Sequence, residues 1–276
     1  MRMLRPQWRI VLLYLVAGSL WIFFSDLLVA QLVRDPVWIL RVQSIKGWLF
    51  ILITAALLFV LIRRDLNRMR AANQALVESY DQTIRGWVRV MDLRHKETRD
   101  HTRRVTLMTL ALARRAGIDD AGQLKQIERG ALLHDIGKIG IPDAILIKPG
   151  KLDAQEWQQM QQHVTIGHRL VSDIAFLRPC ADIPHYHHEK WDGSGYPEGL
   201  QGEAIPLAAR LFALVDVWDA LSHPRVYKAA WPEPEVLSYL AEHSGRHFDP
   251  QLVKLFINHY PDLKAELATA LAQQAD

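Results

Sequence analysis

HDIGKIGIP at residues 134–142 and HHEKWDGSGYP at residues 187–197 are the stretches from which this chain is best interpreted. Each begins with two adjacent side chains that can bind a metal, His134-Asp135 and His187-His188, and continues into a turn with glycine and proline. Adjacent side chains point apart in a helix or a strand, so each pair predicts a bridge between neighbouring ions. Imidazole combined with carboxylate suits iron, manganese or zinc. Together the two stretches predict a metal centre.

The composition allows one good-sized domain with accessory segments. The chain has 276 residues, of which 50% are hydrophobic, and this is enough for a buried core. The net charge is +3 without a long lysine and arginine run, so we expect no DNA partner. Cys180 is the single cysteine, which excludes an intrachain disulfide and favours a reducing compartment.

The first 62 residues predict a membrane anchor with two transmembrane helices. Residues 10–30 are apolar apart from Ser19, Ser25 and Asp26, and residues 47–62 form a second, shorter apolar run. Arginines before the first run and after the second favour a hairpin with both ends in the cytoplasm. The segment 31–46 is expected to be the loop between the two helices.

Two alternatives apply to this N-terminal part. A secretory signal also begins with basic and apolar residues, but the first run is long for one and a second run follows it. Asp26 is costly in hydrocarbon, so it either has a function there or, as we favour, reaches water near the outer end of its helix.

Residues 63–86 are predicted to form a helical linker, because no glycine or proline interrupts the chain between Ile62 and Gly86. Along it, positions recur at alternating three- and four-residue steps, and all but two of them are apolar. They are Leu66, Met69, Asn73, Leu76, Tyr80, Thr83 and Trp87. This heptad-like seam predicts a coiled-coil homodimer. The alternative is a lone helix packed against its own domain.

Residues 87–276 are expected to be all-α, because no run alternates apolar and polar residues as a strand does. The predicted helices are 98–116, 123–133, 153–169, 208–221, 233–242 and 250–258. Asp153 and Glu156 predict a capping box at the start of the third. We therefore expect a helical bundle with metals between its helices.

Further candidate ligands lie on these helices. Glu97 and His101 are four residues apart and share one helical face, so they can converge on one ion. His163 lies within a predicted helix, and Asp216 lies on an apolar helix where an unpaired carboxylate is costly to bury. Each residue alone could equally be a satisfied core histidine or a helix cap. Their combination favours metal binding.

Four segments are also long and specific enough to compare with a known family: HDIGKIGIP, HHEKWDGSGYP, IPLAARLFALVDVWDAL at 205–221 and PRVYK at 224–228. They closely resemble the HD-GYP family, a branch of the HD phosphohydrolases, over residues 86–258. The resemblance implies an HD-type helical bundle that hydrolyses cyclic di-GMP with two or three iron or manganese ions. The ligands it implies are His101, His134, Asp135, His163, His187, His188 and Asp216, and Glu97 matches a glutamate that serves a third metal in some members.

The residue types suggest how such a site works. A carboxylate that bridges two cations, Asp135, helps to lower the pKa of a shared water, and Lys138 one turn later can contact a phosphate oxygen. The resemblance implies that Arg225 and Lys228 hold the substrate's phosphates; without it they would be a solvated surface pair. Pro224 stands one place earlier than in the family, which leaves the spacing of the two cations unchanged.

The GYP loop, residues 193–197, is the remaining predicted substrate contact. Gly195 allows a backbone conformation that a loop beside a substrate can need. Tyr196 could stack on guanine, contact a partner such as a diguanylate cyclase or another signalling protein, or pack beneath the loop. His168, His185 and Asp219 match no ligand position and are expected to lie near the site without binding metal.

The sequence thus predicts a bacterial inner-membrane protein whose cytoplasmic domain hydrolyses cyclic di-GMP to pGpG, with further cleavage to GMP left open. Two rival hypotheses remain. The domain could act on another cyclic dinucleotide or nucleotide, or it could be a non-catalytic module that only binds one. The complete ligand set argues against the second.

Overall fold

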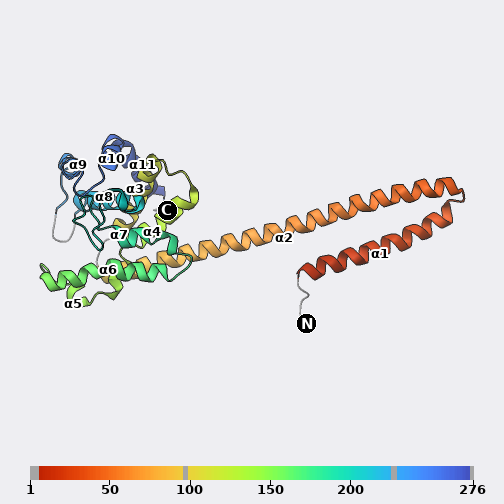
Figure 1. The fold of residues 1–276 in the computed structure, drawn as a ribbon, viewed down its shortest axis with the longest axis horizontal. Helices are drawn as coiled ribbons and strands as arrows, with labels where there is room; N and C mark the ends of the chain where they lie inside the picture. The colour runs from red at the N-terminus through yellow and green to blue at the C-terminus, as the bar shows by residue number, and fades with distance from the viewer. Residues whose placement is uncertain (1–5, 96–98, 225–228, 274–276) are drawn as a thin grey trace. The chain divides into compact units, whose positions relative to one another are not determined.

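The computed structural model describes residues 6–95, 99–224 and 229–273, whose fold is shown in Figure 1. Within these ranges the chain forms α-helices and short 3-10 helices, and its strand-like pairings are two isolated bridges, Asp192–Gln201 and Ser244–Phe248. The all-α prediction is confirmed. Backbone contacts divide the chain into two compact units, Met1–Ser79 and Tyr80–Asp276.

The first unit consists of α1 (Pro6–Leu32) and the larger part of α2 (Pro36–His95). Segments Trp8–Leu32 and Pro36–Met91 of these helices are long and apolar enough to cross a membrane. Lys46 of α2 forms an ion pair with Asp26 of α1, whose side chain remains 52% exposed. Asp26 therefore has both a partner on the neighbouring helix and access to its surroundings.

The predicted loop 31–46 is wrong, because only residues 33–35 separate the two helices. The second helix begins at Pro36, and the fixed φ of proline suits the first helical position. The Asp35 carboxylate accepts a hydrogen bond from the Val37 N–H at 2.8 Å, which caps this start. The apolar run from residue 47 is thus the interior of a longer helix.

The end of α2 belongs to the second unit, where one of its faces is buried. Ile84 packs in a cluster with Leu133 and Leu177. The Asp81 carboxylate accepts a hydrogen bond from Arg129 Nε at 2.8 Å and lies 3.0 Å from Lys125 Nζ. α2 is therefore an integral part of this unit from Tyr80 onward.

The six predicted helices of this unit are all present, with ends that differ by up to three residues. They are α3 (Arg99–Arg115), α4 (Ala121–Leu132), α6 (Ala154–Ser172), α8 (Leu207–Ser222), α9 (Glu233–Glu242) and α10 (Pro250–Asn258). The capping box of α6 is formed as predicted: Asp153 accepts the Glu156 N–H and Glu156 accepts the Asp153 N–H. The remaining elements are η1 (Ile136–Gly140), α5 (Asp143–Leu146), η2 (Arg178–Cys180), α7 (Asp182–Tyr186), η3 (Gly202–Ala204) and α11 (Tyr260–Gln273).

The main hydrophobic core lies between α3, α8, α10 and α11. Met108, Leu112, Phe212, Phe256 and Leu263 are fully buried in it. Because each such side chain contributes about 1.5–3 kcal/mol on burial, this core fixes α3 against α8. It thereby holds the polar residues of these two helices opposite each other.

Candidate metal centre

Six predicted ligands form two groups of three. One group contains His101, His134 and Asp216, and the other contains His163, His187 and His188. Within each group, one nitrogen or oxygen from each residue lies within 4.8 Å of the others. The first group comes from α3, the turn after α4, and α8; the second comes from α6 and the end of α7. Segments far apart in sequence thus meet at one place.

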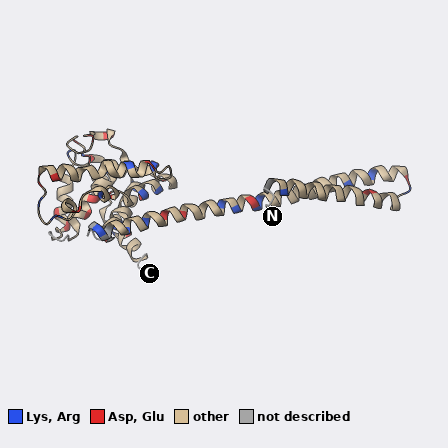
Figure 2. Cartoon of the chain, turned by 90° about the horizontal axis from the view of Figure 1, so that it is seen from below, with Lys and Arg blue, Asp and Glu red and all other residues tan. Residues whose placement is uncertain are grey.

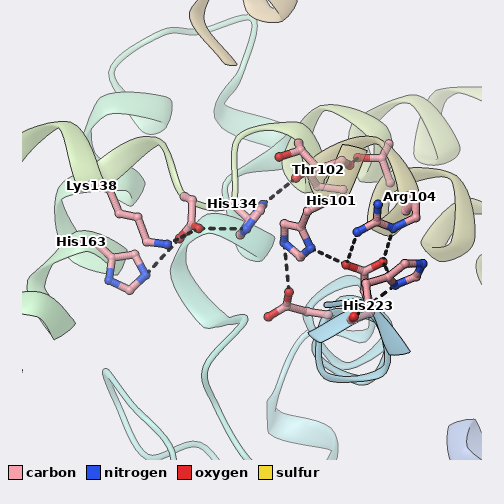
Figure 3. Close-up of polar contacts among 12 residues, drawn as sticks. His101, Thr102, Arg104, His134, Lys138, His163 and His223 are labelled. Carbon is pink, nitrogen blue, oxygen red and sulfur yellow. Dashed lines mark hydrogen bonds and ion pairs between the residues drawn. The ribbon is translucent and has the colours of Figure 1, made fainter. Parts of the chain in front are cut away.

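Asp135 lies between the two groups. Its Oδ2 is 3.1 Å from His134 Nε2, and its Oδ1 is 3.5 Å from His163 Nε2. Lys138 Nζ donates a hydrogen bond to Oδ2. In Figure 3 Lys138 and His163 lie on one side of His134, and His101 lies on the other. Each carboxylate oxygen therefore faces a different group, as a bridging ligand requires.

Four histidines are oriented by hydrogen bonds at Nδ1. The Nδ1–H of His134, His163 and His187 donates to the carbonyls of Ala131, Met160 and Ile183 at 2.9, 2.7 and 2.9 Å. The Nδ1–H of His101 donates to Asp219 Oδ2 at 2.7 Å. These bonds fix the tautomer that leaves the lone pair on Nε2, which is the usual arrangement of a histidine that binds a metal.

The buried nitrogens of the second group also fit a cation. His163 Nε2 and His187 Nε2 are buried and have no hydrogen-bond partner. An unsatisfied buried polar atom costs about 1–3 kcal/mol, so such atoms call for a ligand. A divalent metal that accepts the imidazole lone pair satisfies them, and the donor set of the site therefore fits metal binding.

The charges of the site favour the same conclusion. Burial lowers the pKa of His163, lowers that of His187 well below its usual value, and lowers that of His188 to about 3. Burial alone would raise the pKa of Asp135, but Lys138 and the neighbouring histidines lower it well below the usual value. At neutral pH the second group thus offers neutral imidazoles and Asp135 offers an ionised carboxylate, the forms that bind cations.

A family profile described as an HD domain matches residues 72–252. The chain belongs to the HD-domain family.

Curated relatives of this HD domain are phosphodiesterases by name. The 3'3'-cGAMP-specific phosphodiesterase 2 of Vibrio cholerae is 41% identical over 192 residues, which are 69% of this chain and 37% of that protein. The cyclic di-GMP phosphodiesterase response regulator RpfG of Xanthomonas campestris is 38% identical over 212 residues, which are 75% of this chain and 56% of that protein. This chain therefore spans about half or less of the length of these relatives.

A solved structure supports the fold. The crystal structure of a cyclic GMP-AMP-specific phosphodiesterase of Vibrio cholerae superposes with a TM-score of 0.53 at 21% identity, covering 70% of this chain and 52% of that one. Because the sequence identity is low, this likeness bears on the fold of the HD domain alone.

Asp219 lies beside the first group of ligands, next to His101. Its buried carboxylate accepts hydrogen bonds from Arg104 at 2.6 and 2.9 Å as well as from His101, and it lies 3.0 Å from His223 Nδ1. Burial would raise its pKa, but these partners hold the pKa below its usual value. Asp219 therefore lies beside the first group and orients His101.

Glycine is required where η1 of the HD domain meets α6. A Cβ on Gly137 would lie 1.8 Å from the His163 carbonyl oxygen and 2.5 Å from the Gly167 nitrogen. Such distances are far inside van der Waals contact. The backbone after Asp135 therefore approaches the helix that carries His163 as closely as only glycine permits, and this approach brings the two ligands together.

The GYP loop is fixed by a similar contact and by a buried carboxylate. A Cβ on Gly195 would lie 2.3 Å from the Lys190 nitrogen, which explains the glycine. Glu189 is 2% exposed and accepts backbone hydrogen bonds from Glu198, Gly199 and Leu200 at 2.8, 3.0 and 3.1 Å. Sequence reasoning missed this role of Glu189. The only signal was an acidic residue directly after the histidine pair.

Tyr196 packs beside the second group of ligands. Its ring lies 4.8 Å from the His188 ring and 6.4 Å from the Trp157 ring, measured between centroids. Burial and the charges of Asp135 and Asp216 raise the pKa of its hydroxyl. The tyrosine is thus held near the site, half-buried, with its hydroxyl protonated at neutral pH.

His187 and His188 differ from the expectation that they point apart. Both belong to one group, with ring centroids 4.0 Å apart. The rings of His168 and His185 contact each other in a tilted arrangement, with centroids 4.1 Å apart, and join neither group. Glu97, Arg225 and Lys228 lie outside the described residues.

Proposed function

We propose that this chain is a metal-dependent phosphodiesterase that hydrolyses cyclic di-GMP to the linear dinucleotide pGpG and so lowers this bacterial second messenger. The observation that carries the proposal is the position of Asp135, whose two oxygens face two separate groups of ligands. The names of the relatives, phosphodiesterases of cyclic di-GMP and of cGAMP, support it. Further cleavage of pGpG to GMP is left open.

In this proposal the two groups and Asp135 hold two divalent ions, iron or manganese, and Glu97 serves a third. When bound, such ions supply Lewis acidity and a water that ionises near neutral pH. The ligand set suits these metals because it mixes imidazole with carboxylate and lacks thiolate.

The protein's own groups bind and orient the substrate. Lys138 pairs with Asp135, so its ammonium lies beside the bridging carboxylate. There it can contact an oxygen of the phosphate that is attacked. Arg225 and Lys228 bind the other phosphate oxygens, arginine in a bidentate manner. Tyr196, held against His188, offers an aromatic face on which a guanine base can stack, and Gly195 lets the loop carry it there.

A second candidate substrate is 3'3'-cGAMP, because a relative that is 41% identical bears that specificity in its name. Both molecules contain two 3'–5' phosphodiester bonds and differ in one base. The metal site would therefore treat them alike, and discrimination would fall to the contacts around the base.

The deciding experiment measures turnover by the full chain in detergent, purified without oxygen and loaded with Mn²⁺ or Fe²⁺. Cyclic di-GMP, 3'3'-cGAMP, cyclic di-AMP and cyclic GMP are supplied in parallel, and the products are separated by chromatography. We expect pGpG from cyclic di-GMP at the highest kcat/KM. Preference for 3'3'-cGAMP would favour the second candidate, and binding without turnover would favour a non-catalytic module.

We further propose that residues 1–62 anchor the protein in the bacterial inner membrane, that residues 63–86 link the anchor to residues 87–276, and that the catalytic domain is cytoplasmic. Support comes from apolar side chains that are exposed in α1 and α2, such as Phe23, Leu52 and Phe59 at 65, 65 and 64%. Arg63 and Arg64 follow directly after the apolar run of α2, and charged residues recur along the middle of the helix from there (Figure 2). Basic residues next to an apolar segment favour the cytoplasmic side of the membrane.

A homodimer along α2 completes the proposal. Asp81 and Ile84 lie on the buried face of α2. The predicted seam lies beside this face and is exposed, with Met69, Leu76 and Trp87 at 70, 50 and 43%. Large apolar side chains repeated at heptad spacing fit a second copy of the same helix. The GYP loop remains a candidate contact for a diguanylate cyclase or another signalling protein.

A further inference from the structure

Arg94, near the end of α2, lies against the segment that follows the HD pair. Its Nη1 donates to the carbonyls of Ile139 at 2.7 Å and Lys138 at 3.4 Å, and its Nη2 donates to the Ile141 carbonyl at 3.0 Å. Nε and Nη2 also donate to Asp143 Oδ1 at 3.1 and 2.7 Å. One guanidinium thus holds three backbone carbonyls and the first carboxylate of α5.

These carbonyls need such a partner. They stand at the end of η1, and the residue three positions after Ile139 is Pro142, which has no N–H to donate to the Ile139 carbonyl. The Lys138 carbonyl accepts one backbone hydrogen bond, from the Ile141 N–H at 3.1 Å, and Arg94 approaches the same oxygen. A planar fork with five N–H donors can satisfy several carbonyls at once, whereas a lysine ammonium cannot reproduce this geometry.

The same short segment is held from its other side by α6. Gly137 meets the His163 carbonyl at a distance that excludes any Cβ. The segment that carries Lys138 is therefore fixed between Arg94 of α2 and the backbone of α6. Lys138 Nζ, at the centre of this segment, is hydrogen-bonded to the bridging Asp135.

The ion pair itself contributes little to stability. The side chains of Arg94 and Asp143 are 32 and 65% exposed, and exposed pairs typically contribute at most about 1 kcal/mol. What Arg94 adds is geometry, because misplacing a catalytic group by about 1 Å can cost about a hundredfold in rate.

We propose that Arg94 is a positioning residue for Lys138, and that α2 thereby holds the catalytic segment in its active geometry. The inference rests on the proposed phosphodiesterase function and assigns α2 a direct role in it. In this view the end of α2 sets the position of Lys138.

The test is a double-mutant cycle in the full chain with Arg94→Ala, Lys138→Ala and the combined variant. Each is assayed with cyclic di-GMP and Mn²⁺ below its melting temperature. If Arg94 acts through Lys138, Arg94→Ala lowers kcat about 10- to 100-fold in the natural chain and less than about 3-fold in the Lys138→Ala background. Arg94→Lys stays impaired, and the matched control Arg89→Ala, an exposed arginine of the same helix, keeps full activity.

Hydrogen exchange gives a readout that does not depend on turnover. In Arg94→Ala, amides of residues 136–143 should exchange at least about tenfold faster, while those of α9 do not change. Equal losses of kcat in both backgrounds, natural kcat in Arg94→Ala, or unchanged exchange at 136–143 would each overturn the proposal. If the natural chain cleaves no cyclic dinucleotide, the proposed function fails, and the exchange result still decides whether Arg94 holds the segment.

Discussion

At the scale of single residues, Asp135 carries more of the site than any other side chain. It faces both groups of ligands, and it is ionised because Lys138 and the histidines outweigh the cost of its burial. We expect Asp135→Ala to lower kcat about a thousandfold, since the loss of a metal bridge removes several kcal/mol of transition-state stabilisation. The assay is hydrolysis of cyclic di-GMP, with metal content measured by mass spectrometry.

The matched control for this variant is Asp173→Ala, an exposed aspartate at the end of α6. Helix content by circular dichroism should be nearly the same in both variants and in the natural chain. Substantial turnover by Asp135→Ala would contradict the bridging role.

Glu97 supports a separate prediction about metal number. If it serves a third ion, Glu97→Ala should reduce the bound metal by one per chain, because the other two positions keep all of their ligands. Metal analysis of protein purified without oxygen measures this directly. An unchanged ratio of metal to chain would remove the third position and leave the other two intact.

At the scale of elements, the site depends on how closely η1 approaches α6. A methyl group on Gly137 cannot fit 1.8 Å from the His163 carbonyl oxygen, so Gly137→Ala must push the two elements apart. We expect this variant to lose at least half of its bound metal and about 90% or more of its activity.

Gly86→Ala is the control for this variant, since nothing lies within 4 Å of a Cβ at that position of α2. It should keep its activity and gain up to about 1 kcal/mol from the higher helix propensity of alanine. Normal metal content in Gly137→Ala would show that the close approach is dispensable.

The docking of α2 onto the domain predicts a dependence on pH. Burial raises the pKa of Asp81, but hydrogen bonds from Arg129 and Lys125 outweigh it and hold the pKa below its usual value. The ionised Asp81 carboxylate and its two cationic partners therefore stabilise the fold at pH values above the pKa of about 4 that Asp81 has in the unfolded chain. This contribution is lost as the pH falls through the lower pKa of Asp81 in the folded chain.

Asp81→Asn should accordingly lower the free energy of unfolding by about 2–3 kcal/mol at pH 7 and by less below pH ~4. Denaturant unfolding of the full chain, with chelator present so that metal release plays no part, measures both values. A difference that stays constant across this pH range would mean that the ion pair is not the cause.

The sequence predicted helices with a clear apolar period or cap better than elements too short to show one. Residues 233–242 and 250–258 were placed correctly because their apolar periodicity covers whole turns, and the α6 start followed from its capping box. α7, with five residues, is too short to show a period, and its end sets the direction of His187 and His188. Which ligands share a group depends on the packing of η1, α6 and α8, and no local pattern encodes that.

At the scale of the whole molecule, α2 is the element common to both units. It is continuous from Pro36 to His95, so the apolar segment, the exposed seam and Arg94 lie on one helix. Under the proposed role of Arg94, a change in the register of residues 80–95 would reach residues 138–143 through Arg94 and α4 through Asp81. Dimerisation along the seam would then be one way to set its position.

The seam therefore yields the last prediction. A cysteine at Leu76 should form a disulfide between two copies in the membrane under mild oxidation, because residues at heptad core positions of a parallel dimer face each other. Glu78→Cys, on the opposite side of the helix, is the control and should give little. Native Cys180 does not compete, since it is buried and burial raises its pKa to about 12, which suppresses the reactive thiolate. Equal cross-linking of the two variants would contradict a dimer through this seam. If neither variant cross-links, α2 packs only against the domain of its own chain.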